Sequence, residues 1–163
     1  MLTTPIAATT RACPRPVRIA FDVTIGRAPV TSIGRLPAAD AVWPGKCRHI
    51  IRTSLRAWGR PHLVEDAELL ISELVTNALL HGRGELRVLL YFSAHDFVME
   101  VRDSSPEHPV LCHADTDNEH GRGLHLVDAV AASWGISSDG TTTWCSLPLA
   151  VGPAAMQPRP VQP

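Results

Sequence analysis

Apolar and polar residues alternate in several stretches of the chain, a pattern that predicts strands with one buried face. The first stretch is residues 17–25. A hairpin is expected over residues 86–103, with its turn at 93–96. A second hairpin is expected over residues 134–147, turning around Asp139-Gly140. Because such short turns join neighbouring strands, both pairs are predicted to be antiparallel.

Apolar residues recur every three or four positions in two longer segments, and this period predicts amphipathic helices. The first helix should occupy about residues 44–58 and the second about residues 61–81. Gly82 directly follows the second helix and is expected to end it in a left-handed conformation. A third, shorter helix is expected over residues 122–133.

This order of elements predicts the fold class. Consecutive strands joined by short turns favour a mostly antiparallel sheet, and the three main helices would then cover one face of it. We therefore expect an α+β two-layer sandwich. A parallel doubly wound sheet would require helices between successive strands, and they are missing here.

Composition shifts suggest where the folded domain begins and ends. Residues 1–16 and 151–163 contain many prolines and no apolar period, so both are expected to be disordered tails. Residues 17–36 form an N-terminal strand region, with a second short strand expected near 31–36. The main domain is expected to span residues 37–150.

Charge and cysteine content exclude several classes of protein. Lys and Arg total 15 and Asp and Glu total 16, for a net charge of −1, so nucleic acid is not an expected partner. The four cysteines form no CxxC pair, which argues against a disulfide framework or a cysteine-rich zinc site. No apolar run is long enough to cross a bilayer. A cytoplasmic protein without membrane contact is expected.

The second predicted helix carries a polar stripe. Glu73, Asn77 and His81 are successive i, i+4 neighbours and share one face. An Asn side-chain oxygen suits Mg²⁺, and a carboxylate one turn away can accept a proton. Taken alone, however, such a stripe is more typical of the solvated face of an amphipathic helix.

The residues around this stripe favour a functional role over a merely solvated face. Residues 72–82 read Ser-Glu-Leu-Val-Thr-Asn-Ala-Leu-Leu-His-Gly, which closely resembles the N box of the GHKL ATPases. The form of this motif resembles the anti-sigma-factor serine kinases, of the actinobacterial type, in particular. The resemblance implies Asn77 as the Mg²⁺ ligand, Glu73 as the catalytic base and His81 as a nucleotide-binding residue.

A second motif closes the strand that ends the first hairpin. Val101-Arg102-Asp103 resembles the start of the GHKL G1 box, where an Asp accepts a hydrogen bond from the adenine amino group. Asp103 falls on the apolar face of its strand, and a carboxylate there needs a partner. The alternative is that Asp103 caps the turn that follows it.

A third motif opens the last predicted helix. Gly121-Arg122-Gly123-Leu124 resembles the G2 box, whose glycines let the backbone approach phosphates at a helix N-terminus. Alone, these glycines could also mark a hinge. The chain lacks the third glycine of a dinucleotide fingerprint, and it has no P-loop motif. The three boxes lie in the GHKL order, and the resemblance covers about residues 37–148.

Two departures from the family pattern leave the activity open. Ser104-Ser105-Pro106 stand where the superfamily has glycines, and Thr141 stands where many relatives have a Lys. The loop between 104 and 120 holds His, Cys and Asp residues, but their spacing matches no zinc motif, and a mobile lid is favoured there.

The resemblance implies a protein serine/threonine kinase that uses ATP and Mg²⁺. It would phosphorylate an anti-anti-sigma protein, sequester a sigma factor and form a homodimer. The alternative is a module that occludes a partner, with or without ATP, and transfers no phosphate. A sensor histidine kinase is disfavoured, because the chain has no room for a helix pair bearing a substrate His.

Overall fold

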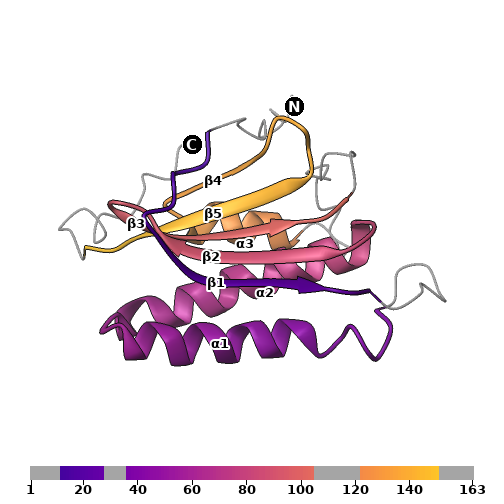
Figure 1. The fold of residues 1–163 in the computed structure, drawn as a ribbon, viewed down its shortest axis with the longest axis horizontal. Helices are drawn as coiled ribbons and strands as arrows, with labels where there is room; N and C mark the ends of the chain where they lie inside the picture. The colour runs from indigo at the N-terminus through magenta and orange to yellow at the C-terminus, as the bar shows by residue number, and fades with distance from the viewer. Residues whose placement is uncertain (1–11, 28–35, 105–121, 151–163) are drawn as a thin grey trace, which may run out of the picture.

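The structure is a computed structural model that describes residues 12–27, 36–104 and 122–150. Its elements appear in the predicted order (Figure 1). They are β1 (Arg18–Ile25), α1 (Trp43–Ala57), the 3₁₀ turn η1 (Pro61–Leu63), α2 (Val64–His81), β2 (Leu86–Phe92), β3 (Asp96–Arg102), α3 (Arg122–Val130), β4 (Ser133–Ile136) and β5 (Thr142–Pro148). The predicted strand near 31–36, both expected tails and the expected lid fall mainly or wholly outside the described residues.

The five strands form one sheet in the order β1-β2-β3-β5-β4, and every neighbouring pair is antiparallel. The helices lie on one side of this sheet, with α1 and α2 as a neighbouring pair (Figure 1). The prediction of an α+β two-layer sandwich is therefore confirmed. None of the described helices is long and apolar enough to cross a membrane.

The main core lies between the helices and the sheet. Because side chains alternate along a strand, every second residue of β2, β3 and β5 faces the helices. The fully buried members from these strands and from α2 are Leu86, Val88, Leu90, Phe97, Met99, Cys145, Ala67, Leu70, Ile71 and Val75. Val101 ends this row in β3, so the next residue on the same face is Asp103. The apolar register thus places that carboxylate at the helix side of the sheet.

A smaller cluster covers the other face of the sheet. Tyr91, Val98 and Trp144 are buried there, and Cys13 packs against them. The hydroxyl of Tyr91 donates a hydrogen bond of 2.6 Å to the carbonyl of Pro14, which holds residues 12–17 over the strands. The three cysteines among the described residues, Cys13, Cys47 and Cys145, are free thiols.

The prediction for β1 was only partly right. Phe21 and Val23 are half-buried and Ile25 is buried, as the alternation indicated. Ile19, however, is 60% exposed. The pairing with β2 shifts register between Ile19 and Phe21, and such a bulge turns the preceding side chains away from the face that the rest of the strand buries.

The expected left-handed cap at Gly82 was wrong. Gly82 has φ −74° and ψ 175°, which is extended backbone, whereas the left-handed glycine that follows a helix is Gly59, at φ +70° after α1. The end of α2 has a different stabilising contact. The guanidinium of Arg27, just after β1, donates hydrogen bonds to the carbonyls of Ala78 (2.8 Å) and Leu79. A cation at this end of a helix also complements its dipole.

The boundaries of the remaining elements agree with the sequence to within a few residues. α3 ends at Val130, three residues before the predicted end, and its chain then passes directly into β4. The final hairpin turns through Gly140 at φ +75°, a conformation that suits glycine at the predicted Asp-Gly turn.

Candidate functional site

The polar stripe of α2 lies at the boundary between the core and solvent. Glu73 and Asn77 are half-buried, while His81 is exposed at the end of the helix. The neighbouring residues Leu74 and Ala78 are buried and fix the rotation of α2 against the sheet. Packing therefore holds Glu73 and Asn77 at the edge of the helix layer, where a ligand can reach them.

The first turn of α3 lies directly against Glu73. A Cβ atom placed on Gly123 would stand 2.6 Å from Oε2 of Glu73, closer than side-chain carbons approach other atoms. Gly123 therefore permits a contact between two motifs that are fifty residues apart in the chain. The backbone N–H groups at the start of α3 form the positive end of its dipole, close to the carboxylate.

The partial burial of Glu73 changes its acid–base behaviour. Removal from water raises the pKa of its carboxyl group above the ordinary value, because the charged form loses hydration. A carboxylate with a raised pKa is a stronger base, so Glu73 is suited to accept a proton in a site near neutral pH.

Asp103 lies at the other end of the stripe. Its backbone N–H donates a hydrogen bond of 2.9 Å to the carbonyl of Thr141, next to the final hairpin turn. Its carboxyl group lies so close to Gly82 that a Cβ there would come within 2.6 Å of Asp103 Cγ and within 2.5 Å of the Ala78 carbonyl oxygen. Gly82 is thus required for close approach rather than for a left-handed turn.

The chain after Asp103 is also tightly placed. The backbone N–H of Ser104 donates a hydrogen bond of 2.8 Å to the carbonyl of Arg83. Its Oγ lies 2.6 Å from the position that a Cβ of Gly84 would occupy, and Gly84 itself has φ +67°. The loop after α2 and the end of β3 therefore hold Asp103 half-buried between them.

The predicted residues form two groups along α2. Glu73 meets Gly123 at one end, Gly82 meets Asp103 at the other, and Asn77 lies between them on the same helix. Nine residues separate Glu73 from Gly82, which is about 13 Å of helix. This length suits an extended nucleotide lying along α2, with its phosphates near α3 and its base near Asp103.

Not every predicted residue can be placed in this way. Gly121 and the side chain of Arg122 lie outside the described part of the chain, although Arg122 begins α3 as expected. Leu124 is 8% exposed, so its side chain is buried rather than presented to a ligand.

Thr143 is a further residue near Asp103 that was not singled out from the sequence. This residue pairs with Val101 in the β3–β5 register, and it shares the helix-facing side of β5 with the core residues Cys145 and Leu147. It is 9% exposed, and the antiparallel register makes it a diagonal neighbour of Asp103. Threonine is common in strands, so the sequence carried only a weak signal, a hydroxyl on the apolar side of the last predicted strand.

Nothing in the described residues suggests a metal site made by protein ligands alone. No group of three or more His, Cys, Asp or Glu residues is gathered there, and the expected lid with its His and Cys residues is outside this part. The side chains that are present fit Mg²⁺ in a different way, because this ion accepts one or two protein oxygens and takes the rest from phosphates and water. Asn77, with Glu73 one turn away, offers such a donor.

A family model described as a histidine kinase-like ATPase domain matches residues 38–147, more than half of the chain. The match begins before α1, ends in β5 and includes Glu73, Asn77, Asp103 and Gly123. A search of curated proteins gave no match.

The close approach at Gly82 generates a stability prediction. Gly82→Ala should lower the free energy of unfolding by about 1–3 kcal/mol, because the added methyl group meets a backbone carbonyl and the Asp103 carboxyl. Gly26→Ala is the matched control, since a Cβ there meets nothing within 4 Å, and it should change stability by less than about 0.5 kcal/mol. Urea denaturation measures both. Equal effects of the two substitutions would contradict the close packing at Gly82.

The raised pKa of Glu73 generates a pH prediction. A carboxyl whose pKa is higher in the folded than in the unfolded chain stabilises the fold most below its unfolded pKa, and this contribution is lost as the pH rises through the folded pKa. Glu73→Gln is neutral throughout, so its stability relative to wild type should increase as the pH rises from about 4 to about 7. Urea denaturation at several pH values measures this, with Glu85→Gln as the control for loss of an exposed carboxylate. A difference that is constant or falls with pH would refute the raised pKa.

Proposed function

The chain belongs to the histidine kinase-like ATPase domain family, and on this premise we propose that it is an ATP-dependent regulatory serine/threonine kinase of the anti-sigma-factor type. The observation that carries the proposal is the contact between Glu73 and the first turn of α3 at Gly123. It brings a basic carboxylate to the helix N-terminus that the G2 resemblance assigns to phosphate binding.

Each residue then has a defined task in phosphoryl transfer. Asn77 would hold Mg²⁺ through its side-chain oxygen, and the bound ion would supply charge neutralisation at the phosphates. Glu73 would accept the proton of the attacking Ser or Thr hydroxyl, a task for which partial burial prepares it. The backbone N–H groups around Gly123 would stabilise negative charge on the transferred group.

Asp103 would recognise the base of the nucleotide. Its position on the helix side of the sheet, beside Gly82 and diagonal to Thr143, leaves a half-buried acceptor in a mostly apolar setting. An exocyclic amino group is the donor that such a carboxylate would accept from. Thr143 supplies a hydroxyl that can bond to the base, to Asp103 or to a bridging water.

The protein partners follow from the resemblance of residues 72–82 to the N box of anti-sigma kinases. We propose that the chain phosphorylates a Ser or Thr on an anti-anti-sigma protein and sequesters a sigma factor, as a homodimer in the cytoplasm. Retention of Glu73 favours this enzymatic role over simple binding.

A second function is favoured by one specific feature, the final hairpin turn. Where many relatives have a lysine, Thr141 donates through its backbone N–H (3.1 Å) and its hydroxyl (2.9 Å) to Asp139 Oδ1. Hydrogen bonds from Ser137 and Thr141 lower the pKa of Asp139 to about 2. This turn, which borders Asp103, presents a bound nucleotide with a carboxylate rather than a cation. Weaker nucleotide binding would leave a module that occludes a partner without phosphorylating it.

Calorimetric titration with ATP, with and without Mg²⁺, separates the two functions when it is combined with an assay of basal ATP hydrolysis. Asn77→Ala should weaken Mg-ATP binding by at least about 10-fold, because it removes the proposed ion ligand. Glu73→Ala should bind within about threefold of wild type yet lose at least about 100-fold in hydrolysis, the usual contribution of a general base.

Thr53→Ala, on the exposed side of α1, is the control and should change neither quantity. If Asn77→Ala binds Mg-ATP as tightly as wild type, the assignment of the magnesium ligand is wrong. If wild type binds Mg-ATP without hydrolysing it, the occluding module replaces the kinase.

A further inference from the structure

The charges of the chain are unevenly distributed around α1. Between Asp40 and Glu65 the sequence has no acidic residue, yet five of its 15 Lys and Arg residues lie there: Lys46, Arg48, Arg52, Arg56 and Arg60. The whole chain, in contrast, has a net charge of −1. Positive charge is therefore concentrated on this one helix and on the turn that follows it.

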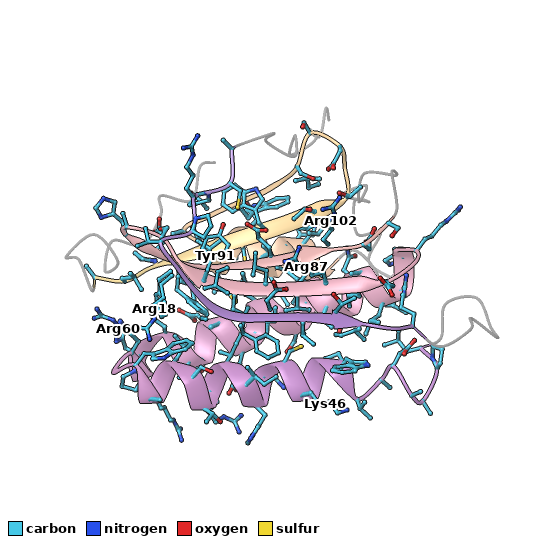
Figure 2. The ribbon with its side chains drawn as sticks, viewed as in Figure 1. Arg18, Lys46, Arg60, Arg87, Tyr91 and Arg102 are labelled. Carbon is cyan, nitrogen blue, oxygen red and sulfur yellow. The ribbon has the colours of Figure 1, made fainter. Side chains whose placement is uncertain are left out.

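Packing directs these cations outward. α1 buries Cys47, Ile51 and Leu55 against the core, so the opposite side of the helix faces solvent. Lys46, Arg52, Arg56 and Arg60 are all exposed, and together they form what we call the α1 basic ridge. Lys46 and Arg56 are ten residues apart, about 15 Å along the helix. Figure 2 shows Lys46 and Arg60 along the helix layer, away from Arg87 and Arg102 on the sheet.

Some of the cations of α1 have contacts within the described part of the chain. Arg52 forms an ion pair with Glu68 of α2 (2.6 Å), and Arg48 donates a hydrogen bond of 2.9 Å to the hydroxyl of Ser72. Lys46 lies over the ring of Trp43, 4.4 Å from its centroid. Within the described residues, neither Arg56 nor Arg60 has an ion-pair partner.

This arrangement does not favour the stability of the helix. Arg48, Arg52 and Arg56 are successive i, i+4 neighbours, and like charges at that spacing repel one another. Lys46 lies in the first turn, where the helix dipole disfavours a cation and where α1 has no acidic residue. Arg56 lies in the last turn, where the dipole favours a cation, so helix stability accounts for that position but not for Lys46 or for the i, i+4 repulsion. An external anion would relieve this repulsion.

The neighbouring charges indicate which kind of anion fits. The first turn of α2 presents Glu65 and Asp66 to solvent, and Glu68 lies against Arg52. These three carboxylates border the basic ridge on its α2 side. A nucleic-acid backbone or an anionic membrane presents negative charge over a wide area and would meet both signs, whereas a protein segment can place its carboxylates on the ridge alone.

We infer that the α1 basic ridge docks an acidic segment of a partner protein, whose carboxylates pair with Lys46, Arg56 and Arg60. The ridge is on the solvent side of α1, and the nucleotide-site candidates Asn77 and Asp103 are on other elements. Docking therefore goes beyond the proposed kinase activity, and it is testable without nucleotide. Failure of one proposal leaves the other standing.

The test measures binding of a fluorescein-labelled 20-residue polyglutamate peptide to the full chain by fluorescence anisotropy, without ATP and at about 50 mM salt. Lys46→Gln/Arg56→Gln/Arg60→Gln should weaken binding by at least about 10-fold, because it removes the three ridge cations that form no ion pair with another described residue. Arg15→Gln/Arg87→Gln/Arg102→Gln carries the same change in net charge at exposed positions outside α1, and it should bind within about twofold of wild type. Thermal unfolding of each variant verifies that it is folded.

Three results would overturn the inference. The first is equal weakening by both triple variants, which would mean that binding follows net charge rather than the ridge. The second is tighter binding of a DNA duplex of equal charge at the same salt, which would identify a nucleic-acid surface. The third is no binding of the peptide at millimolar concentration.

Discussion

The absence of one methyl group at Gly123 allows the first turn of α3 to lie against Glu73. This contact joins two helices that are separated in the chain by the first hairpin and the long segment after it. It places the Glu73 carboxylate next to the N-terminal turn of α3, whose N–H groups form the positive end of the helix dipole. Burial raises the pKa of the same carboxyl group. The phosphate-binding role proposed for α3 relies on this proximity.

The rest of the site depends on the apolar layer between helices and sheet. Leu74 and Ala78 bury one side of α2, which leaves Glu73 and Asn77 at the layer's edge. The row of apolar side chains that β3 contributes to this layer ends at Val101. Asp103, the next residue on the same face, therefore lies at the border of the apolar layer, beside Gly82. Packing thus places two carboxylates and an amide along one helix, at positions that would otherwise be costly for polar groups.

Much of this could be predicted from sequence, because periodicity reports which face of an element is buried. The alternation in 86–103 gave the β2–β3 hairpin almost to the residue, and the stripe on α2 correctly placed Glu73 and Asn77 on one face. Alternation does not reveal register, so the bulge that exposes Ile19 could not be foreseen. The motifs indicated that Glu73 and Gly123 belong to one site, but only packing brings their atoms together.

Two misjudged residues have the same physical origin. A glycine after a helix serves either a left-handed backbone or a close approach, and the sequence alone does not distinguish them; at Gly82 close approach was the reason. Thr143 was overlooked because threonine is common in strands, and its place beside Asp103 appears only when β5 is paired with β3. In both cases the decisive neighbours are distant in the chain, and no local pattern contains them.

The most direct test of the central claim is a titration of ¹⁵N-labelled protein with Mg-ATP, followed by amide NMR spectra. If the nucleotide lies along α2, the amides of Asn77, Gly82, Asp103 and Gly123 should shift together with a single binding constant. Those of Tyr91 and Val98, on the opposite face of the sheet, should remain unchanged. Shifts confined to that opposite face, or none at millimolar Mg-ATP, would contradict the account.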